Sequence, residues 1–510
     1  MLKSDEIDKL IKIDKNSRAK RRARIGQKYY EAEHDILGYK IYYFNADDEI
    51  IEDTSRSNIK ISHPFFTELV DQEVQFLLSK FEIKAKKETD KILNDELKDR
   101  FNKSFKSELS DTCEGTIVKG WNYMYGYLDK DNKTRFKNAD SLGVIEVRKE
   151  ESSDNAEYII YYYIDRIDEK NNPITKIEVW DAKFRYFFIK VGTGAIELDT
   201  NESINPRPHK VYKQNDELVY KPSEPGYDKI PFFRLNNNKK SVSALKPIKK
   251  IIDDYDLMSC GLSNNLQDVA DALYVVKGFK GNDLDKLQHN IKSKKMIGVG
   301  DNGDVDIKTI DIPYEARKAK MELDEQNIYK FGMGFNAGQV GDGNITNVVI
   351  KSRYTLLVLK CNKLKRYLET FLSELIELEL EEINKDNNTN YTLNDVDISI
   401  EYEIPTSETD DASIKKTEAE TKQIQVDIIL SAASKLDDET IIKELCEVLD
   451  LDYEEIKGKI EVNKIDLNQA SETLDGIQQN GAVNADGQIA GWSWKADNRK
   501  WKTSAKRIKE

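Results

Sequence analysis

Apolar residues recur along residues 346–384 at alternating steps of four and three, which places them on one face of a single long helix. The positions that form this seam are Leu357, Cys361, Leu364, Leu368, Phe371, Leu375 and Leu378. A charged helical segment, residues 313–331, precedes the seam, and a run with five glycines, residues 331–344, separates the two. Since each glycine costs roughly 1 kcal/mol in a helix interior relative to alanine, the pattern predicts a hairpin of two helices with a mobile, small-residue tip.

The first 127 residues follow mainly helical patterns. Residues 1–35 predict basic helices, an amphipathic helix follows within residues 57–83, and helix is predicted to continue over residues 88–127. A basic cluster lies in the first of these segments, formed by Arg18, Lys20, Arg21, Arg22 and Arg24. Such a cluster is typical of a solvated helix face, and contact with phosphate or with an acidic partner is the alternative.

Between residues 143 and 234 the apolar period changes to two, and turn signals separate the segments. This predicts a mostly antiparallel β region. Helical spacing returns over residues 243–277, and a small module over residues 278–311 is expected to hold a short helix and short strands. The remaining expected elements are a strand over residues 396–404 and helices over residues 413–436, 438–449 and 453–460.

Beyond residue 463 the chain is polar and contains glycine, so weak structure is expected. It closes on a basic stretch that contains Trp492, Trp494 and Trp501. Three interpretations stay open: contact with single strands or phosphate, docking of the tryptophans on neighbouring subunits, and disorder.

The 510 residues are too many for one ordinary core, so several subdomains are expected. The net charge of −14 argues against a general DNA coat, but not against a channel through which DNA slides. The scattered cysteines (Cys113, Cys260, Cys361 and Cys446) suit small core residues in a reducing compartment. No apolar run approaches the roughly 20 residues of a membrane span and no signal peptide opens the chain, so we expect no membrane partner and synthesis in the cytoplasm.

No motif favours an enzyme. Residues 298–303 have the glycine pattern of a dinucleotide site, but a strand pattern follows where a helix must begin, so they predict a hairpin turn. The histidines are far apart, with no ligand partner at helical spacing: they are His34, His63, His209 and His289. We therefore expect no cofactor, no metal and no catalytic residue.

The order of several segments along the chain resembles that of phage portal proteins, in particular those of siphophages that infect Gram-positive bacteria. The segments are Tyr29-Tyr30 with residues 33–36, residues 57–61, residues 252–256, residues 268–278 and residues 328–332. The similarity covers roughly residues 25–460, and the tail after residue 463 finds no clear counterpart.

The resemblance implies an α+β portal fold assembled as a ring, usually of twelve subunits, at one vertex of the capsid. The implied parts are a wing (residues 1–242 and 348–405), two stem helices (243–277 and 312–331), a small α/β clip (278–311), a tunnel loop (332–347), a helical crown (406–462) and a tail (463–510). The seam of the long helix would pack within the subunit and against a neighbour.

The resemblance also implies two sets of contact residues. The tunnel-loop set, expected to face DNA in the channel, is Gly338, Gln339, Gly341, Asp342, Gly343, Asn344, Thr346 and Asn347. The clip set, expected to dock other proteins, is Lys280, Asp283, Lys286, His289, Lys292, Lys294, Asp301 and Asp304.

The implied role is a DNA conduit in the virion, through which the genome is packaged and later ejected. The implied partners are double-stranded viral DNA, the terminase motor, head-completion or adaptor proteins, and the major capsid and scaffolding proteins. Two other classes compete with this interpretation. An enzyme such as a nuclease would need a convergent acidic or histidine cluster, and a structural adaptor or minor-head protein with a coiled-coil hairpin would leave the β region unexplained.

Overall fold

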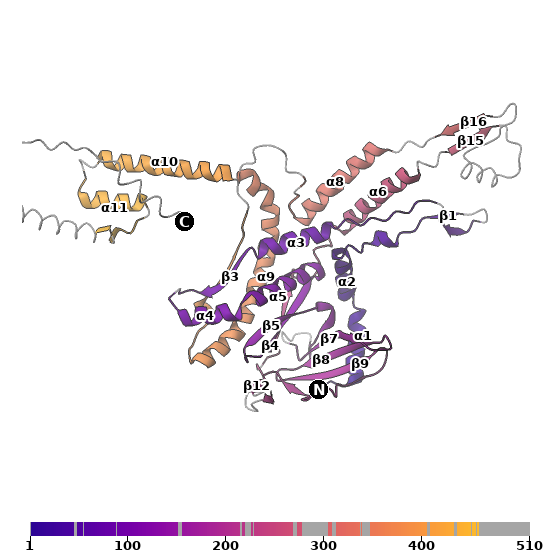
Figure 1. Ribbon diagram of the computed structural model, residues 1–510, viewed down its shortest axis with the longest axis horizontal. Coiled ribbons are helices and arrows are strands. Elements are labelled where there is room, and N and C mark those ends of the chain that lie inside the picture. Colours follow the sequence, from indigo (N-terminus) through magenta and orange to yellow (C-terminus); the bar gives the residue numbers. More distant parts are fainter. Residues whose placement is uncertain are drawn as a thin grey trace, which may run out of the picture. The chain divides into compact units, whose positions relative to one another are not determined.

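The computed structural model describes most of the chain between residues 2 and 457 (Figure 1). The described residues are 2–44, 48–54, 56–87, 89–150, 156–214, 217–219, 226–227, 229–268, 273–277, 304–308, 313–336, 338, 347–404, 408–432, 436–449, 451–454 and 456–457. The chain divides into two compact units, Met1–Ser407 and Glu408–Glu510. The fold is mixed helix and sheet, as the α+β prediction required.

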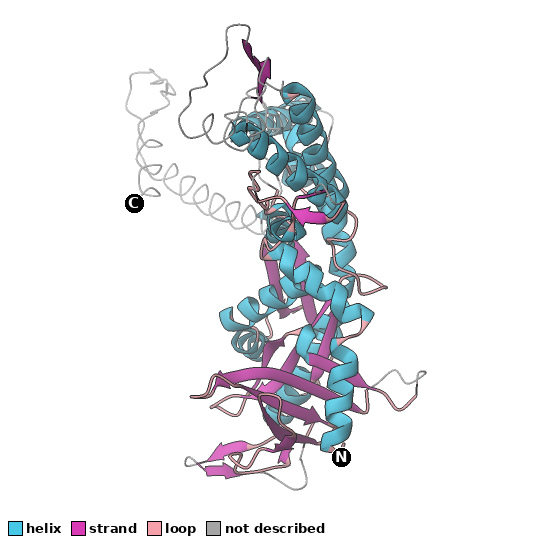
Figure 2. Ribbon diagram, turned by 90° about the vertical axis from the view of Figure 1, so that its right-hand side faces the viewer, coloured by secondary structure: helices cyan, strands magenta, loops and turns pink. Residues whose placement is uncertain are grey.

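The first unit opens with two helices, α1 (Ser4–Lys15) and α2 (Arg18–Tyr30). Ser17 separates them because its side chain accepts a hydrogen bond from the Lys20 backbone and caps α2. Ile7 and Ile11 on α1 are buried in a core with sheet residues, and Figure 2 shows this helix lying along the strands near the N-terminus. A 3₁₀ turn, η1 (Asp35–Gly38), then leads to a two-stranded hairpin of β1 (Tyr42–Phe44) and β2 (Ile50–Glu52).

The predicted β region is confirmed as antiparallel. One sheet has six strands in the order β10-β9-β8-β7-β6, with β11 also paired to β9. Its strands are β6 (Val144–Val147), β7 (Tyr158–Ile167), β8 (Pro173–Trp180), β9 (Phe184–Val191), β10 (Ile196–Leu198) and β11 (Arg207–Pro208). The 3₁₀ turn η2 (Ser141–Gly143) enters this sheet, and β12 (Tyr212–Gln214) with β13 (Glu217–Val219) forms a separate hairpin.

The helix predicted over residues 88–127 is wrong at its C-terminal end. The structure has α3 (Phe65–Leu77), α4 (Lys91–Arg100) and α5 (Lys103–Lys119), and α5 stops at Gly120, which is left-handed at φ 102°. The aromatic residues that follow form β4 (Trp121–Leu128), because rings pack well on a pleated surface. β4 lies between β14 (Phe232–Asn236) and β5 (Thr134–Ala139), while β3 (Lys80–Ala85) pairs with β17 (Val396–Glu401).

The helix predicted over residues 243–277 is also too long. The structure has α6 (Lys249–Asp268), and the β-branched and aromatic run after it forms β15 (Leu273–Lys277). β15 pairs with β16 (Asp304–Lys308), where a strand was predicted, and the chain returns through α8 (Tyr314–Gly332). α6 and α8 lie side by side (Figure 1).

The long helix is confirmed as α9 (Asn347–Asn387). All seven seam residues are at most 2% exposed within this chain, where α9 packs against α3 and β14. The expectation that the seam also contacts a neighbour is therefore wrong. The predicted hairpin of two helices is wrong as well, because α8 packs along α6 and not along α9. A 3₁₀ turn, η5 (Leu393–Asp395), connects α9 to β17.

The second unit contains α10 (Glu408–Ala432) and α11 (Asp438–Val448), which pack on each other. Asp437 caps α11 by accepting from the Thr440 backbone. Both helices were predicted, with somewhat different ends, and the basic tryptophan-containing tail lies outside the described residues. Over the described ranges of both units, no helix is apolar and long enough to span a bilayer.

Candidate functional site

The pair formed by α6 and α8 is joined by charge as well as by packing. Lys320 on α8 reaches Asp254 on α6 at 2.5 Å and also pairs with Asp324 one turn further along its own helix. The hydrogen bonds that Lys320 donates to the carboxylates of Asp254 and Asp324 raise the pKa of its ammonium group. The two segments predicted as stem helices are therefore held together side by side.

The start of the glycine-rich run is fixed, which the sequence did not predict. α8 ends at Met333, which is left-handed at φ 55°. The next residue, Gly334, lies so close to α3 that an added Cβ would be 2.0 Å from Leu69 Cδ2. Gln72 on α3 then binds both backbone groups of Phe335, at 2.9 and 3.0 Å. This glycine therefore permits close packing on α3 and does not serve mobility.

Two of the predicted tunnel-loop residues lie in the described part of the chain. Gly338 is exposed and donates its backbone N–H to Asn336 Oδ1 at 2.9 Å, and Asn336 in turn donates to Glu325 on α8. Asn347 begins α9 and is 8% exposed. The others, Gln339, Gly341, Asp342, Gly343, Asn344 and Thr346, lie outside the described residues. Their contact with DNA stays a prediction.

One predicted clip residue is placed by its backbone. Asp304 is the first residue of β16 and lies opposite Lys277 of β15. The remaining clip residues, Lys280, Asp283, Lys286, His289, Lys292, Lys294 and Asp301, lie outside the described residues. The short strands of the predicted module thus begin five residues earlier than expected, at Leu273 within the predicted helix.

A buried cluster of two histidines and one aspartate was missed by sequence reasoning. His34 Nδ1 lies 2.6 Å from one carboxyl oxygen of Asp256, and His63 Nδ1 lies 2.8 Å from the other. The side chains of His34 and Asp256 are 0% exposed, and the Tyr29 ring stacks on His34. Burial opposes ionisation of Asp256, but the hydrogen bonds from both histidines outweigh it and lower the pKa of this carboxyl.

This cluster joins three parts of the chain that the sequence keeps far apart. His34 follows α2, His63 precedes α3, and Asp256 belongs to α6. His34 and His63 are separated from Asp256 by 222 and 193 residues, so no local sequence spacing predicts the contact. Among the residues that the structure describes, no group of histidine, cysteine, aspartate or glutamate side chains has the arrangement of a metal site. The cluster is a structural clamp.

The basic cluster of α2 is divided between two roles. Lys20 is 3% exposed and donates to the Val144 carbonyl at 2.8 Å, with Asp14 at 3.0 Å. Burial lowers the pKa of this lysine despite the neighbouring carboxylate. Arg18, Arg21 and Arg22 are exposed. Lys20 therefore fixes α2 to the sheet, and the arginines are left to meet solvent or a partner.

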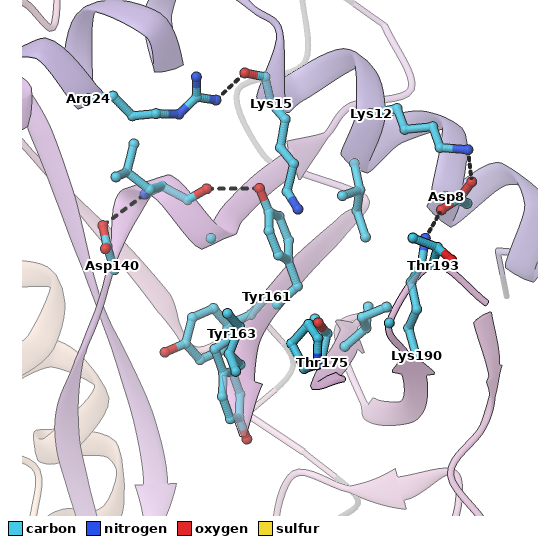
Figure 3. Close-up of a pocket in the computed structure, with 18 residues that line it drawn as sticks. Asp8, Lys12, Lys15, Arg24, Asp140, Tyr161, Tyr163, Thr175, Lys190 and Thr193 are labelled. Atoms are coloured by element: carbon cyan, nitrogen blue, oxygen red, sulfur yellow. Dashed lines mark hydrogen bonds and ion pairs between the residues drawn. The ribbon is translucent and has the colours of Figure 1, made fainter. Parts of the chain in front are cut away.

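A cavity of about 930 Å³ lies among α1, α2 and the strands β7 to β9 (Figure 3). Its charged groups are mostly paired: Asp8 lies between Lys12 and Lys190, and Lys15 lies over the Tyr162 ring. Figure 3 shows Asp8 joined to Lys12 and to Lys190 at one side of the cavity. The charged groups that line the cavity are therefore largely satisfied by one another and by neighbouring rings.

Comparison with known proteins defines the class. The family described as "Phage portal protein, SPP1 Gp6-like" matches residues 9–460. The portal protein of Clostridium phage phiCD119 is 26% identical over 393 residues, which cover 73% of this chain and 82% of that protein. The portal protein of Bacillus phage SPP1 is 24% identical over 343 residues, which cover 67% of this chain and 66% of that protein.

These matches place the chain in a family of structural proteins of phages. It belongs to the phage portal protein family, of the type represented by phage SPP1. Its role as a portal in the packaging and ejection of the phage genome follows from that membership.

Proposed function

We propose that this chain assembles as a closed ring, of twelve subunits, at one vertex of the capsid, and that double-stranded DNA passes through the central channel. The observation that carries this proposal is the course of the chain through α6, the paired strands β15 and β16, and back through α8. Such an element gives each subunit one section of a channel wall with a turn at its end. Repetition around an axis then closes the wall.

Exposed apolar side chains on these helices support burial against neighbouring subunits. Leu257 and Leu266 on α6, and Leu323 and Phe331 on α8, are all exposed in the single chain. An exposed apolar surface on a soluble protein is typical of an interaction site. In a ring, these side chains are covered by the next subunit.

The tunnel loop suits DNA that must move. Its predicted contact residues include the neutral donors Gln339, Asn344 and Thr346, and the chain as a whole has a net charge of −14. Lysine and arginine contacts to phosphate release counterions and bind tightly, whereas neutral hydrogen bonds position the backbone with little charge attraction. A small loop without lysine or arginine, on an acidic subunit, therefore holds DNA loosely.

The clip, residues 278–311, is the proposed docking surface for the terminase during packaging and for head-completion or adaptor proteins afterwards. The wing and crown are proposed to meet the major capsid and scaffolding proteins. The β15–β16 pair supports this layout because Lys277, which directly precedes the clip, lies opposite Asp304 within it. Opposite charges such as Lys286 and Asp283 then suit successive partners of different charge.

Replacing residues 338–343 by a short rigid linker tests the channel. We expect rings to form in normal number while DNA packaging into proheads falls. A matched control places the same linker at residues 131–133, in the turn between β4 and β5, and should package normally. Normal packaging by the loop variant would refute the tunnel-loop assignment. Monomers or dimers under all assembly conditions, seen by negative-stain imaging of the unaltered protein, would refute the ring.

The alternative of a coiled-coil adaptor loses its main support. That interpretation depended on a hairpin between residues 313–331 and the long helix. α8 instead packs along α6, and the seam of α9 is covered by its own chain. The seam identified from the sequence is therefore not available to a partner helix.

A further inference from the structure

A two-stranded hairpin leaves apolar side chains exposed on both of its faces. Phe44 lies opposite Ile50 on one face, and Tyr43 lies opposite Ile51 on the other. The exposed fractions are 68% for Phe44, 67% for Ile50, 48% for Tyr43 and 40% for Ile51. Within the described sheets, β1 and β2 pair only with each other. An isolated two-stranded hairpin is marginally stable in water, so this one lacks a covering surface.

The hairpin belongs to an arm, which we define as residues 39–62. The return limb of the arm runs along one face of α6. The backbone N–H groups of Ile59, Ile61 and His63 donate to side chains of that helix, at 2.6, 3.1 and 3.0 Å. The acceptors are Asn264, Cys260 and Asp256, spaced four residues apart and therefore on one face of α6.

The base of the arm is clamped at both ends. His34 lies shortly before the arm and His63 directly after it, and both bind the buried carboxyl of Asp256. The clamp and the return limb together hold the arm on α6, while its tip carries the uncovered hairpin (Figure 1). A firmly anchored base with an apolar tip is the arrangement of an arm that reaches another molecule.

The charge of the arm indicates the surface that it meets. Asp48, Glu49, Glu52 and Asp53 accompany the apolar residues of the hairpin, with Lys40 paired to Glu52 and Arg56 to Asp53. Over residues 39–62 the acidic residues outnumber the basic ones, which are Lys40, Arg56 and Lys60. The arm is therefore acidic as well as apolar. Its partner surface is expected to combine positive charge with an apolar side chain.

The chain itself carries such a surface on α2. Arg18, Arg21, Arg22 and Ile25 are exposed, and their spacing of three, one and three residues places them on one face of the helix. Within the described residues, the ion pairs include none of these three arginines. The stripe is thus basic and apolar, which complements the acidic and apolar hairpin.

We propose that the arm of one subunit docks on the α2 stripe of a second copy of this chain. The proposal rests on the ring assembly proposed above. Two different, complementary surfaces on one chain form a head-to-tail interface, which is the kind that closes a ring. Covering the four apolar hairpin side chains contributes to assembly, because buried apolar area is the main favourable term in association.

Photo-crosslinking of the full-length protein tests the contact. The photoreactive analogue p-benzoylphenylalanine replaces Phe44, the protein is assembled and irradiated, and cross-linked peptides are identified by mass spectrometry. We expect covalent dimers in which residue 44 is joined to a peptide containing Arg18–Tyr30 of another copy. Rings that form but cross-link only within one chain would overturn the proposal. In particles, cross-links to a capsid or scaffolding protein in place of α2 would overturn it as well.

Charge reversal supplies an independent measurement. Arg18→Glu, Arg21→Glu and Arg22→Glu together should lower the ring fraction in native mass spectrometry at least tenfold at fixed concentration. Adding Asp48→Lys and Glu49→Lys should restore most of it. A matched control reverses three exposed lysines elsewhere, Lys91→Glu, Lys98→Glu and Lys137→Glu, and should leave the ring fraction unchanged.

The outcomes separate the two proposals. Absence of rings in the unaltered protein contradicts the ring itself, and the arm is then left without its partner. Rings that persist after reversal of the three α2 arginines contradict the docking of the arm on α2 and leave the ring intact. Loss of rings in the lysine control variant would show that general charge, and not the α2 stripe, controls assembly, and would also overturn the docking.

Discussion

Replacing Asp256 by asparagine should release the arm from α6. The carboxylate accepts hydrogen bonds from His34 Nδ1 at 2.6 Å, from His63 Nδ1 at 2.8 Å and from the His63 backbone at 3.0 Å. Asparagine keeps the volume but retains only one accepting oxygen, so its NH₂ group faces a donor. A hydrogen bond to a charged group contributes about 1.5–3 kcal/mol and a buried donor left without its acceptor costs about 1–3 kcal/mol, so we expect a local loss of about 3 kcal/mol.

Hydrogen–deuterium exchange measures this loss where it occurs. Every 1.4 kcal/mol is tenfold in an equilibrium constant, so the amides of Ile59, Ile61 and His63 should exchange roughly 100-fold faster or more. Amides in the six-stranded sheet should be unchanged, because Asp256 contacts none of its strands. The same variant should form fewer rings, since the arm would no longer be held on its helix.

Asp254→Asn is the matched control, two residues away on the same helix. Asp254 is 42% exposed and pairs with Lys320 of α8. Exposed ion pairs are worth about 0–1 kcal/mol, so exchange of the arm amides should change less than about fivefold. Unchanged exchange over residues 57–63 in Asp256→Asn, or an equal change in both variants, would refute the clamp.

Three further changes test the packing. Gly334→Ala forces a Cβ against Leu69 and should lower the free energy of unfolding by about 1–3 kcal/mol, measured by thermal melting. Adding Leu69→Ala to this variant should relieve the clash. Burial lowers the pKa of His209 to about 4. Below pH 6.5 this histidine binds a proton in the unfolded chain but not in the folded chain, so the free energy of unfolding falls between pH 6.5 and 4. In urea unfolding, the wild type should lose about 2 kcal/mol more than His209→Asn between pH 7 and pH 5. Arg100→Met leaves the buried Glu379 carboxylate without the guanidinium that lies 2.5 Å from it. The free energy of unfolding should fall by about 3–5 kcal/mol in the same assay. The double variant Arg100→Met, Glu379→Leu should recover most of this loss.

The long helix was predictable because its signal is local and repeated. Seven apolar positions that recur over about six helical turns fit the period of an α-helix and not that of a strand. All seven are buried in α9. The errors came where one residue type decides the end of an element. Gly120 stops α5 by its left-handed backbone. The run Leu273–Lys277 forms a strand because it pairs with Asp304–Lys308, which lies inside the predicted module and is remote from it in the sequence.

The clamp was not predictable because its parts are remote in the sequence. His34 and His63 follow no ligand spacing, and each meets Asp256 only in the folded chain, where η1 packs on α6 and α2 packs on α3. The sequence did contain weak signs, since residues 33–36, 57–61 and 252–256 all contributed to the family resemblance. Their contact gives a physical reason for grouping them: these segments hold the base of one arm.

Four consecutive residues of α6, from Asp253 to Asp256, connect this helix to α2, to α8 and to the arm. Asp253 accepts from Tyr29 of α2, Asp254 pairs with Lys320 of α8, Tyr255 packs against His63 at 4.8 Å, and Asp256 holds the arm. Successive side chains on a helix point in different directions, so neighbouring residues bind separate elements. The proposed channel wall and the proposed arm therefore share one helix. A change at Asp254 acts on the wall and a change at Asp256 acts on the arm, so the two can be separated by substitutions two residues apart.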